Sequence, residues 1–192
     1  MLRYRLGAPP PTLEENAAEW HHLSVFGERP FFISVGLGIS IAGIFALLWT
    51  LALPGSLPLG SPSFPELIAA LLILVVGHES CHLAGFPKLG FDGNAVAGIW
   101  VERGSPYALY RLPLKRNRFL WVLLLPFLVI SFGPLLIAFF GGSPPPLLQW
   151  CSVLNAFGAA SDMYVFFTLI RHVPSDGVVI ENGNNMSWRT AP

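Results

Sequence analysis

Charged residues are scarce in this sequence of 192 residues, in which Asp, Glu, Lys and Arg together make up 11%. In a typical soluble domain about a quarter of the residues are charged, so the charges here are too few to cover a water-exposed surface of this size. The 11 basic and 11 acidic residues balance, and they form no basic patch of the kind that binds a nucleic-acid duplex. The composition therefore argues against a soluble domain and against a nucleic-acid partner.

Long apolar runs take the place of the missing charges, and hydrophobic residues make up 53% of the chain. A membrane-spanning helix needs roughly 20 consecutive apolar residues. Pro126 and Pro134 lie inside one run, which membrane helices tolerate, usually with a kink. We therefore predict an all-α membrane protein with about four transmembrane helices. The four runs are Phe31–Leu53, Glu66–Phe86, Phe119–Gly142 and Leu147–Ile170.

The basic residues indicate how these helices would cross the membrane. They lie before the first run, between the second and third, and after the fourth, whereas the short loops Pro54–Pro65 and Gly141–Pro146 contain none. Because cytoplasmic loops carry the excess of Lys and Arg, we expect both termini to be cytoplasmic. The absence of eukaryotic targeting signals points to a bacterial plasma membrane. We expect a cytoplasmic segment (1–30), a membrane domain (31–170) and a cytoplasmic tail (171–192).

Smaller elements are expected outside the spans. The sequence from Thr12 to Glu15 resembles a capping box and predicts a short helix over Leu13–Leu23. The runs Ala95–Glu102 and Tyr107–Leu112 predict a cytoplasmic β-hairpin between the second and third helices. This hairpin either offers an open edge to an extended substrate or is a surface element without a role. The last dozen residues are expected to be poorly ordered. The basic cluster is interpreted as a lipid-headgroup anchor; it comprises Lys115, Arg116 and Arg118.

The two cysteines, Cys81 and Cys151, are expected to be free. In the topology above, one lies near the inner end of the second span and the other near the outer end of the fourth. With a rise of 1.5 Å per residue, their depths differ by roughly 15 Å or more. A disulfide requires Cα atoms within about 7 Å of each other, so the two cysteines would be too far apart.

Residues 78 to 82 read His-Glu-Ser-Cys-His, which is the H-E-x-x-H pattern. Positions i and i+4 share a helix face, so His78 and His82 can reach one metal ion. Glu79 can then act as a general base on a metal-bound water. Ionisable residues inside a spanning helix are costly and usually functional. One such residue could simply form a hydrogen bond between helices, but three within one turn favour a Zn²⁺ site.

A hydrolytic zinc site usually has three protein ligands, and Asp162 is the other charged residue inside a span. If the helices end near Phe86 and Ile170, His78 and Asp162 both lie roughly 12 Å from the inner boundary of the membrane. We therefore predict that Asp162 is the third ligand; a helix-packing or ion-pathway role is the alternative. Asn155, two turns earlier on the same face, is expected either to contact substrate and oxyanion or to form a helix–helix hydrogen bond.

The motif of residues 78–82 in a membrane helix, with an Asp in a later helix, resembles the site-2 protease superfamily of intramembrane metalloproteases. The chain is more similar to a family of small bacterial membrane proteins described as zincin peptidases. These combine H-E-x-x-H with a late stretch of small residues that ends in Asp and an aromatic, here Asn155 to Tyr164. Unlike the site-2 proteases, which have Gly after this Asp, the chain has Met163. The resemblance implies catalysis by Glu79 and the zinc ligands His78, His82 and Asp162.

Together these features predict a zinc-dependent intramembrane peptidase that hydrolyses membrane-associated substrates, with a membrane protein or peptide and the lipid bilayer as its partners. One alternative is a non-proteolytic membrane zinc protein, a sensor or carrier, in which Glu79 is dispensable. A catalytically inactive scaffold that binds no metal is the other alternative. An acid between two imidazoles argues against the scaffold. The single hard Asp ligand, without a Cys- or His-rich entry tract, argues against the carrier. The sequence does not indicate the oligomeric state.

Overall fold

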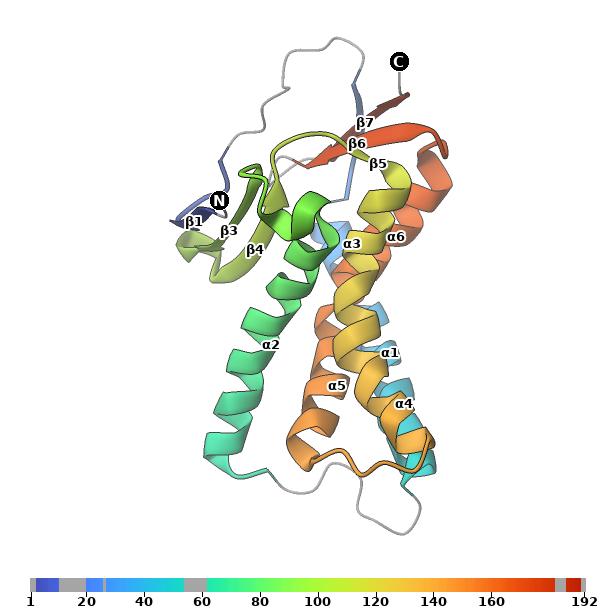
Figure 1. Cartoon of the computed structure of the whole chain (residues 1–192). Helices are drawn as coiled ribbons and strands as arrows, with labels where there is room; N and C mark the ends of the chain where they lie inside the picture. Colours follow the sequence, from blue (N-terminus) through green and yellow to red (C-terminus); the bar gives the residue numbers. More distant parts are fainter. Residues whose placement is uncertain (1–2, 11–19, 26, 54–61, 182–185, 191–192) are drawn as a thin grey trace.

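The computed structural model describes residues 3–10, 20–25, 27–53, 62–181 and 186–190. Within these residues the chain forms a long bundle of helices with two small β-sheets gathered at one end (Figure 1). Both termini lie at the end that carries the sheets. The fold is mostly helical, as predicted, but the two sheets make the all-α description too narrow.

The four predicted spans correspond to helical segments. Three segments are long and apolar enough to cross a membrane, and a fourth qualifies if a pair of helices bent by 45° counts as one span. These lengths and compositions are consistent with a multi-pass membrane protein. The first two segments are α1 (Glu28–Ala52) and α2 (Phe64–Gly85). The third is α3 (Arg116–Pro126), the π-helical turn η3 (Phe127–Phe132) and α4 (Gly133–Phe139), and the bent pair is α5 (Pro146–Gly158) and α6 (Ala160–His172).

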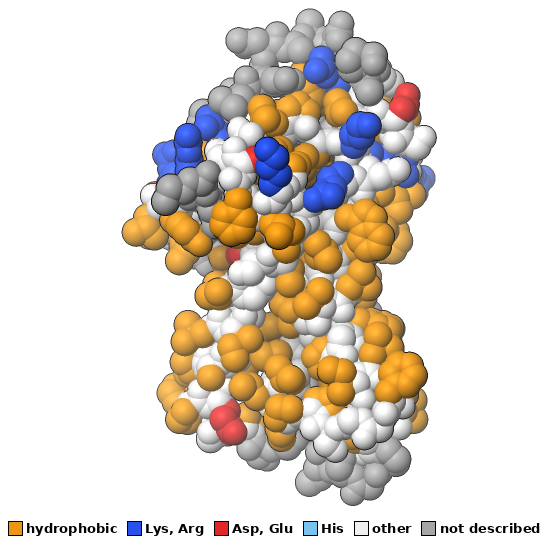
Figure 2. Space-filling model, viewed as in Figure 1, with side chains coloured by type: hydrophobic (Ala, Val, Ile, Leu, Met, Phe, Trp, Pro, Cys, Tyr) orange, Lys and Arg blue, Asp and Glu red, His pale blue; other side chains and the backbone are white. Residues whose placement is uncertain are grey.

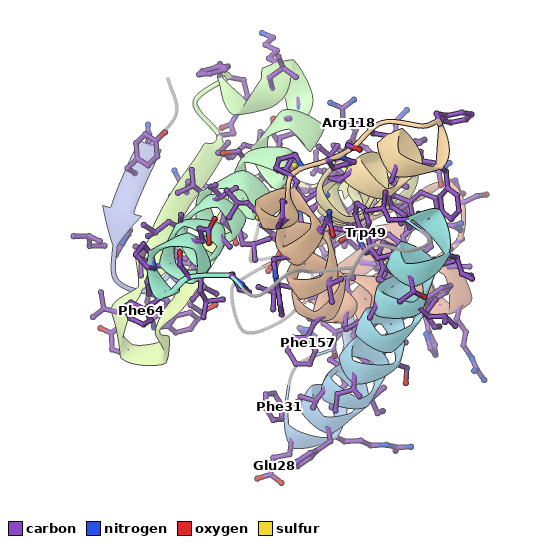
Figure 3. The ribbon with its side chains drawn as sticks, turned by 90° about the horizontal axis from the view of Figure 1, so that it is seen from below. Glu28, Phe31, Trp49, Phe64, Arg118 and Phe157 are labelled. Carbon is purple, nitrogen blue, oxygen red and sulfur yellow. The ribbon has the colours of Figure 1, made fainter. Side chains whose placement is uncertain are left out.

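The bent pair lies in the middle of the bundle. Helix α2 packs against α3 and α5, and α1 packs against α5 and α6. Seen end-on, Trp49 points from α1 into the bundle and is fully buried, whereas Phe31 lies at the periphery (Figure 3). Large apolar side chains remain exposed along the helices, and Figure 2 shows them covering the face below the sheets. An apolar surface of this extent is suited to contact with lipid.

The first sheet has the order β1-β3-β4. Strands β3 (Ala95–Trp100) and β4 (Ser105–Tyr110) form the hairpin predicted between the second and third helices, and β1 (Arg3–Leu6) pairs with β3 in parallel. A Cβ atom on Gly98 would lie 2.3 Å from the carbonyl oxygen of Arg5, so this position requires glycine. The presence of the hairpin is confirmed, and its location in the cytoplasm stays a prediction.

The second sheet joins distant parts of the chain and corrects two predictions. Its order is β2-β7-β6-β5, and all its pairings are antiparallel. Residues His21–Leu23 form a strand rather than the end of a helix, and the remainder of the predicted helix, residues 13–20, lies outside the described residues except for Trp20. Of the last dozen residues, which were expected to be poorly ordered, Met186–Thr190 form β7 and Glu181 ends β6; the other six lie outside the described residues. The strands are β2 (His21–Leu23), β5 (Leu114–Lys115), β6 (Gly177–Glu181) and β7 (Met186–Thr190).

Two arginines of the basic cluster lie at the start of α3 and donate hydrogen bonds to the C-terminal ends of two other helices, α6 and α2. The Nη1 atom of Arg116 donates a hydrogen bond to the carbonyl oxygen of Val173 at 2.8 Å. Arg118 donates to the carbonyl oxygens of Gly85 and Phe86, at 2.6 and 2.9 Å, and so supplies hydrogen-bond donors to the C-terminal end of α2. The interpretation as a lipid-headgroup anchor stays a prediction, but these two side chains also have an internal role. Both cysteines are free, as predicted.

Candidate metal centre

Helix α2 places His78 and His82 on one face, one turn apart. Their ring centroids are 4.8 Å apart, and their Nε2 atoms approach each other to 3.1 Å. His82 is buried and His78 is partly buried. The i, i+4 spacing of the motif therefore aims both imidazoles at one point.

Asp162 completes the cluster from α6. Its Oδ2 atom lies 3.1 Å from Nε2 of His78 and 3.5 Å from Nε2 of His82. The fourth span is broken between Gly158 and Ala160, so Asp162 lies in the first turn of α6 rather than in the middle of a long helix. A helix N-terminus favours a negative charge. The sequence predicted that Asp162 lies at the depth of the histidines, and the structure brings the three side chains together. The break in the helix was not predicted.

Hydrogen bonds on the far side of each ring fix which histidine nitrogen faces the cluster. Nδ1 of His78 lies 3.0 Å from Oδ1 of Asn155, and Nδ1 of His82 lies 2.9 Å from the carbonyl oxygen of Val122. These oxygens can only accept, so each Nδ1 carries the hydrogen and each Nε2 of a neutral ring keeps its lone pair. Such a partner on the opposite nitrogen is the usual support of a metal-binding histidine.

The partner of His82 depends on a proline in the neighbouring helix. Pro126 has no N–H, so the carbonyl group of Val122, four residues earlier, lacks its normal helical partner and accepts from His82 instead. The two helices are also very close here, because a Cβ atom on Gly85 would lie 2.9 Å from Cα of Val122. Pro126, which the sequence marked only as a proline tolerated inside a span, thus helps to orient a site residue.

Asn155 belongs to a buried polar chain that crosses the bundle. Its Nδ2 donates to the carbonyl oxygen of Pro126 at 3.0 Å and to Oγ of Ser131 at 2.9 Å. Ser152 donates to the carbonyl oxygen of Ser131 at 2.7 Å and accepts from Nε1 of Trp49 at 3.1 Å. Both amide hydrogens of Asn155 are therefore engaged, and its oxygen faces His78. Of the two expected roles, these contacts favour the helix–helix hydrogen bond over an oxyanion contact.

The cluster fits a zinc ion. Three acceptor atoms, two Nε2 and one Oδ2, converge at separations of 3.1 to 3.5 Å, and acceptors that close repel each other without a proton or cation between them. The ligands of a tetrahedral zinc ion, bound at about 2.0–2.2 Å, lie roughly 3.3 Å apart. Oδ2 of Asp162 is also buried without a hydrogen-bond donor among the described residues. His78, His82 and Asp162 could thus hold the ion that the motif predicts.

A cavity of about 410 Å³ lies beside the cluster and is lined by all three candidate ligands and by Glu79. The Oε2 atom of Glu79 is buried and has no hydrogen-bond partner among the described residues. Strand β4 contributes residues 105–108 to the wall, and the second sheet contributes Glu181 and Met186. The cavity is therefore enclosed by both the helix bundle and the sheets, and it contains an acid that is free to act on a bound molecule.

Residues 71–176 match the model of the DUF3267 family, described as "Putative zincin peptidase". The chain belongs to this family. Comparisons with curated proteins and with solved structures gave no match. Membership of the DUF3267 family supports a zinc metallopeptidase, and the matched region includes His78, Glu79, His82, Asn155 and Asp162.

Sequence analysis missed Glu181, which lies beyond the region matched by the DUF3267 family. Burial raises the pKa of its carboxyl group to about 7; His82 opposes this shift, and the carboxylates of Asp162 and Glu79 add to it. The sequence around Glu181 does not mark it as a site residue, because charged residues are common in such a tail. Glu181 lines the cavity only because β6 pairs with β7. Pro126, Ser131 and Ser152 were missed as site residues for a similar reason, since their partners come from other helices.

Proposed function

We propose that this protein is a zinc-dependent intramembrane peptidase of the site-2 protease type, which hydrolyses peptide bonds of membrane-associated substrates. The observation that carries the proposal is the convergence of three acceptor atoms at zinc-ligand spacing in a cavity between apolar helices, beside Glu79, whose Oε2 has no hydrogen-bond partner in the part of the chain that the structure describes. A packing site would have satisfied these polar groups with one another. Family membership supports the metallopeptidase class.

His78, His82 and Asp162 would hold the zinc ion, which when bound supplies Lewis acidity and makes water a nucleophile at neutral pH. Asn155 and the carbonyl group of Val122 hold the two rings with Nε2 toward the cluster. Glu79 lies in the next position of the helix and lines the cavity where a scissile peptide would lie.

Glu79 acts as the general base and then as the general acid. Its carboxylate takes one proton from the attacking water as the new C–O bond forms at the peptide carbonyl carbon. It then passes that proton to the amide nitrogen as the C–N bond breaks, which leaves a carboxylic acid and an amine. Burial of Glu79 in a largely apolar cavity strengthens its interaction with the reacting atoms.

The substrate reaches the cavity from the end that carries the sheets. Residues of β4 and of the β6–β7 pair form part of the wall, and they connect the site with the side on which the basic residues gather. By the positive-inside rule this side is cytoplasmic. The proposal therefore places hydrolysis within the membrane near its cytoplasmic boundary.

The test is cleavage of single-span peptides by the purified protein in detergent. The peptides carry a run of about 20 apolar residues followed by a short randomised segment, and mass spectrometry identifies the products. We expect cleavage by the wild type, its loss with a zinc chelator, its recovery when zinc is returned, and no cleavage by Glu79→Gln with its zinc retained. Equal cleavage by Glu79→Gln would contradict the mechanism. A folded, zinc-loaded wild type that cleaves no peptide would favour a sensor or carrier.

A further inference from the structure

We propose that Glu181 forms a subsite for a Lys or Arg side chain of the substrate, on the cytoplasmic side of the scissile bond. This inference rests on the proposed peptidase function and adds the charge of the preferred substrate to it. It is drawn from the position of Glu181, the charge of the cavity and the chemistry of membrane proteins at this depth.

The position of Glu181 is set by the second sheet. It is the last residue of β6 and pairs with Met186 of β7, and both residues line the cavity that contains the metal cluster. Its side chain is partly buried, and within the described part of the chain its carboxylate forms no hydrogen bond or ion pair. A carboxylate with no internal partner in a cavity is available to a bound molecule.

The charge of the cavity favours a cation at this point. Its described lining contains three carboxylates, those of Glu79, Asp162 and Glu181, and no Lys or Arg. Asp162 is a candidate metal ligand and Glu79 is the proposed general base, whereas Glu181 has no assigned role in hydrolysis. A positively charged group beside Glu181 would also favour the charged form of this carboxyl group.

The substrate chemistry supplies such a group. Membrane-spanning segments are flanked on their cytoplasmic side by Lys and Arg, whose long side chains extend toward the interface. Glu181 belongs to the end of the molecule that carries the sheets and the basic residues of this chain, which is the expected cytoplasmic end. A substrate helix that unwinds into the site would therefore bring its flanking Lys or Arg past Glu181.

The experiment compares the cleavage sites chosen by the wild type and by two variants of Glu181 in the randomised single-span peptides described above. In the wild type we expect Lys and Arg to be enriched about tenfold over Gln on the cytoplasmic side of the cut. Glu181→Gln should lose this preference, and Glu181→Lys should replace it with a preference for Asp and Glu. Zinc content should stay unchanged in both variants.

Glu102→Gln is the matched control, because Glu102 lies in the turn between β3 and β4 and does not line the cavity. It should keep the preference of the wild type. Cleavage without charge preference by the wild type, or the same preference in Glu181→Gln, would overturn the subsite while leaving the peptidase in place. A zinc-loaded wild type that cleaves none of the peptides would overturn the peptidase and the subsite together.

Discussion

The two candidate histidine ligands are each held by one hydrogen bond, but the partners differ in kind. His82 donates to a main-chain carbonyl group, which no substitution removes directly, whereas His78 donates to the side chain of Asn155. Asn155 is itself fixed by Pro126 and Ser131. The orientation of His78 is therefore the part of the metal centre that depends most on a single side chain.

Asn155→Ala is expected to weaken zinc binding by about 10- to 100-fold, because His78 loses the acceptor that fixes its ring and tautomer. Competition with a fluorescent zinc chelator in detergent would measure this. Gln149→Ala is the control, because Gln149 is a buried amide on the same helix and donates to Pro144, away from the cluster. Equal zinc affinity of Asn155→Ala and the control would show that His78 does not depend on Asn155.

Glu181 gives a prediction about stability and pH. Its folded-state pKa of about 7 lies above the ordinary value for Glu, so folding disfavours its charged form. The wild type should lose stability relative to Glu181→Gln as the pH rises from about 4.5 to 7, and the difference should stay constant above that. Metal-free Glu181→Gln should therefore melt several degrees above the wild type at pH 8 and close to it at pH 4. A lower melting temperature for the variant at pH 8 would contradict this account.

Among single residues, the sequence alone identified those members of the site that differ chemically from their neighbours in the chain. His78, Glu79, His82 and Asp162 stand out because ionisable groups are rare in apolar helices, and depth along the helices brings three of them together. Glu181 gave no such contrast, because acids are ordinary in a strand outside the membrane. The choice between two roles for Asn155 also required the contacts of its amide group, which depend on side chains from other helices.

The helices that hold the site are irregular at the positions that serve it. The third span contains Pro126 and a π-helical turn, Phe127–Phe132, and the fourth is broken by 45° before Asp162. Such irregularities release main-chain groups or re-aim side chains and are frequent at functional sites. Here they supply an acceptor to His82 and place Asp162 at a helix N-terminus.

Pro126→Ala is expected to weaken zinc binding by roughly tenfold. The restored N–H would compete with His82 for the carbonyl oxygen of Val122. The zinc competition assay measures the change. Pro134→Ala is the matched control: it removes a proline from the same span, but the carbonyl group four residues earlier belongs to Ile130, which is not the partner of either histidine. A similar loss in both variants would indicate a general effect of helix shape rather than the release of Val122.

The hydropathy of the sequence predicted the apolar helical segments to within a few residues, because their length and apolarity are visible in the sequence itself. It did not predict the break at Gly158–Ala160, since no proline marks it and both flanking segments are apolar. The second sheet was missed because its strands are short and pair across nearly the whole length of the chain. Pairing with distant strands overrode the local helix signal at His21–Leu23.

At the scale of the whole molecule, the structure has one apolar end and one polar end. Both sheets and the described basic residues gather at one end, and the end of α1, the start of α2 and the loop between α4 and α5 lie at the other (Figures 1 and 2). An even number of crossings returns the chain to its starting side. With the positive-inside rule, this arrangement supports the proposal that the sheet end is cytoplasmic.

Cysteine labelling in intact cells tests this orientation. Ser143 lies in the loop before α5, and Ser175 lies between α6 and β6; both are exposed. Ser143→Cys should react with a membrane-impermeant maleimide added outside, and Ser175→Cys should react only after the membrane is permeabilised. The native Cys81 and Cys151, assayed in the unsubstituted chain, provide the background. The reverse pattern would place the sheets outside and remove the basis for a cytoplasmic substrate flank.

The most direct test of the account is the zinc content of the detergent-purified protein, measured by elemental analysis. We expect about one zinc per chain in the wild type, less than a tenth of that in His78→Ala and Asp162→Ala, and the wild-type amount in Glu79→Gln. This result would assign the ion to the two histidines and the aspartate and separate binding from catalysis. A folded wild type without zinc, even after zinc is supplied, would contradict the metal centre and the function proposed from it.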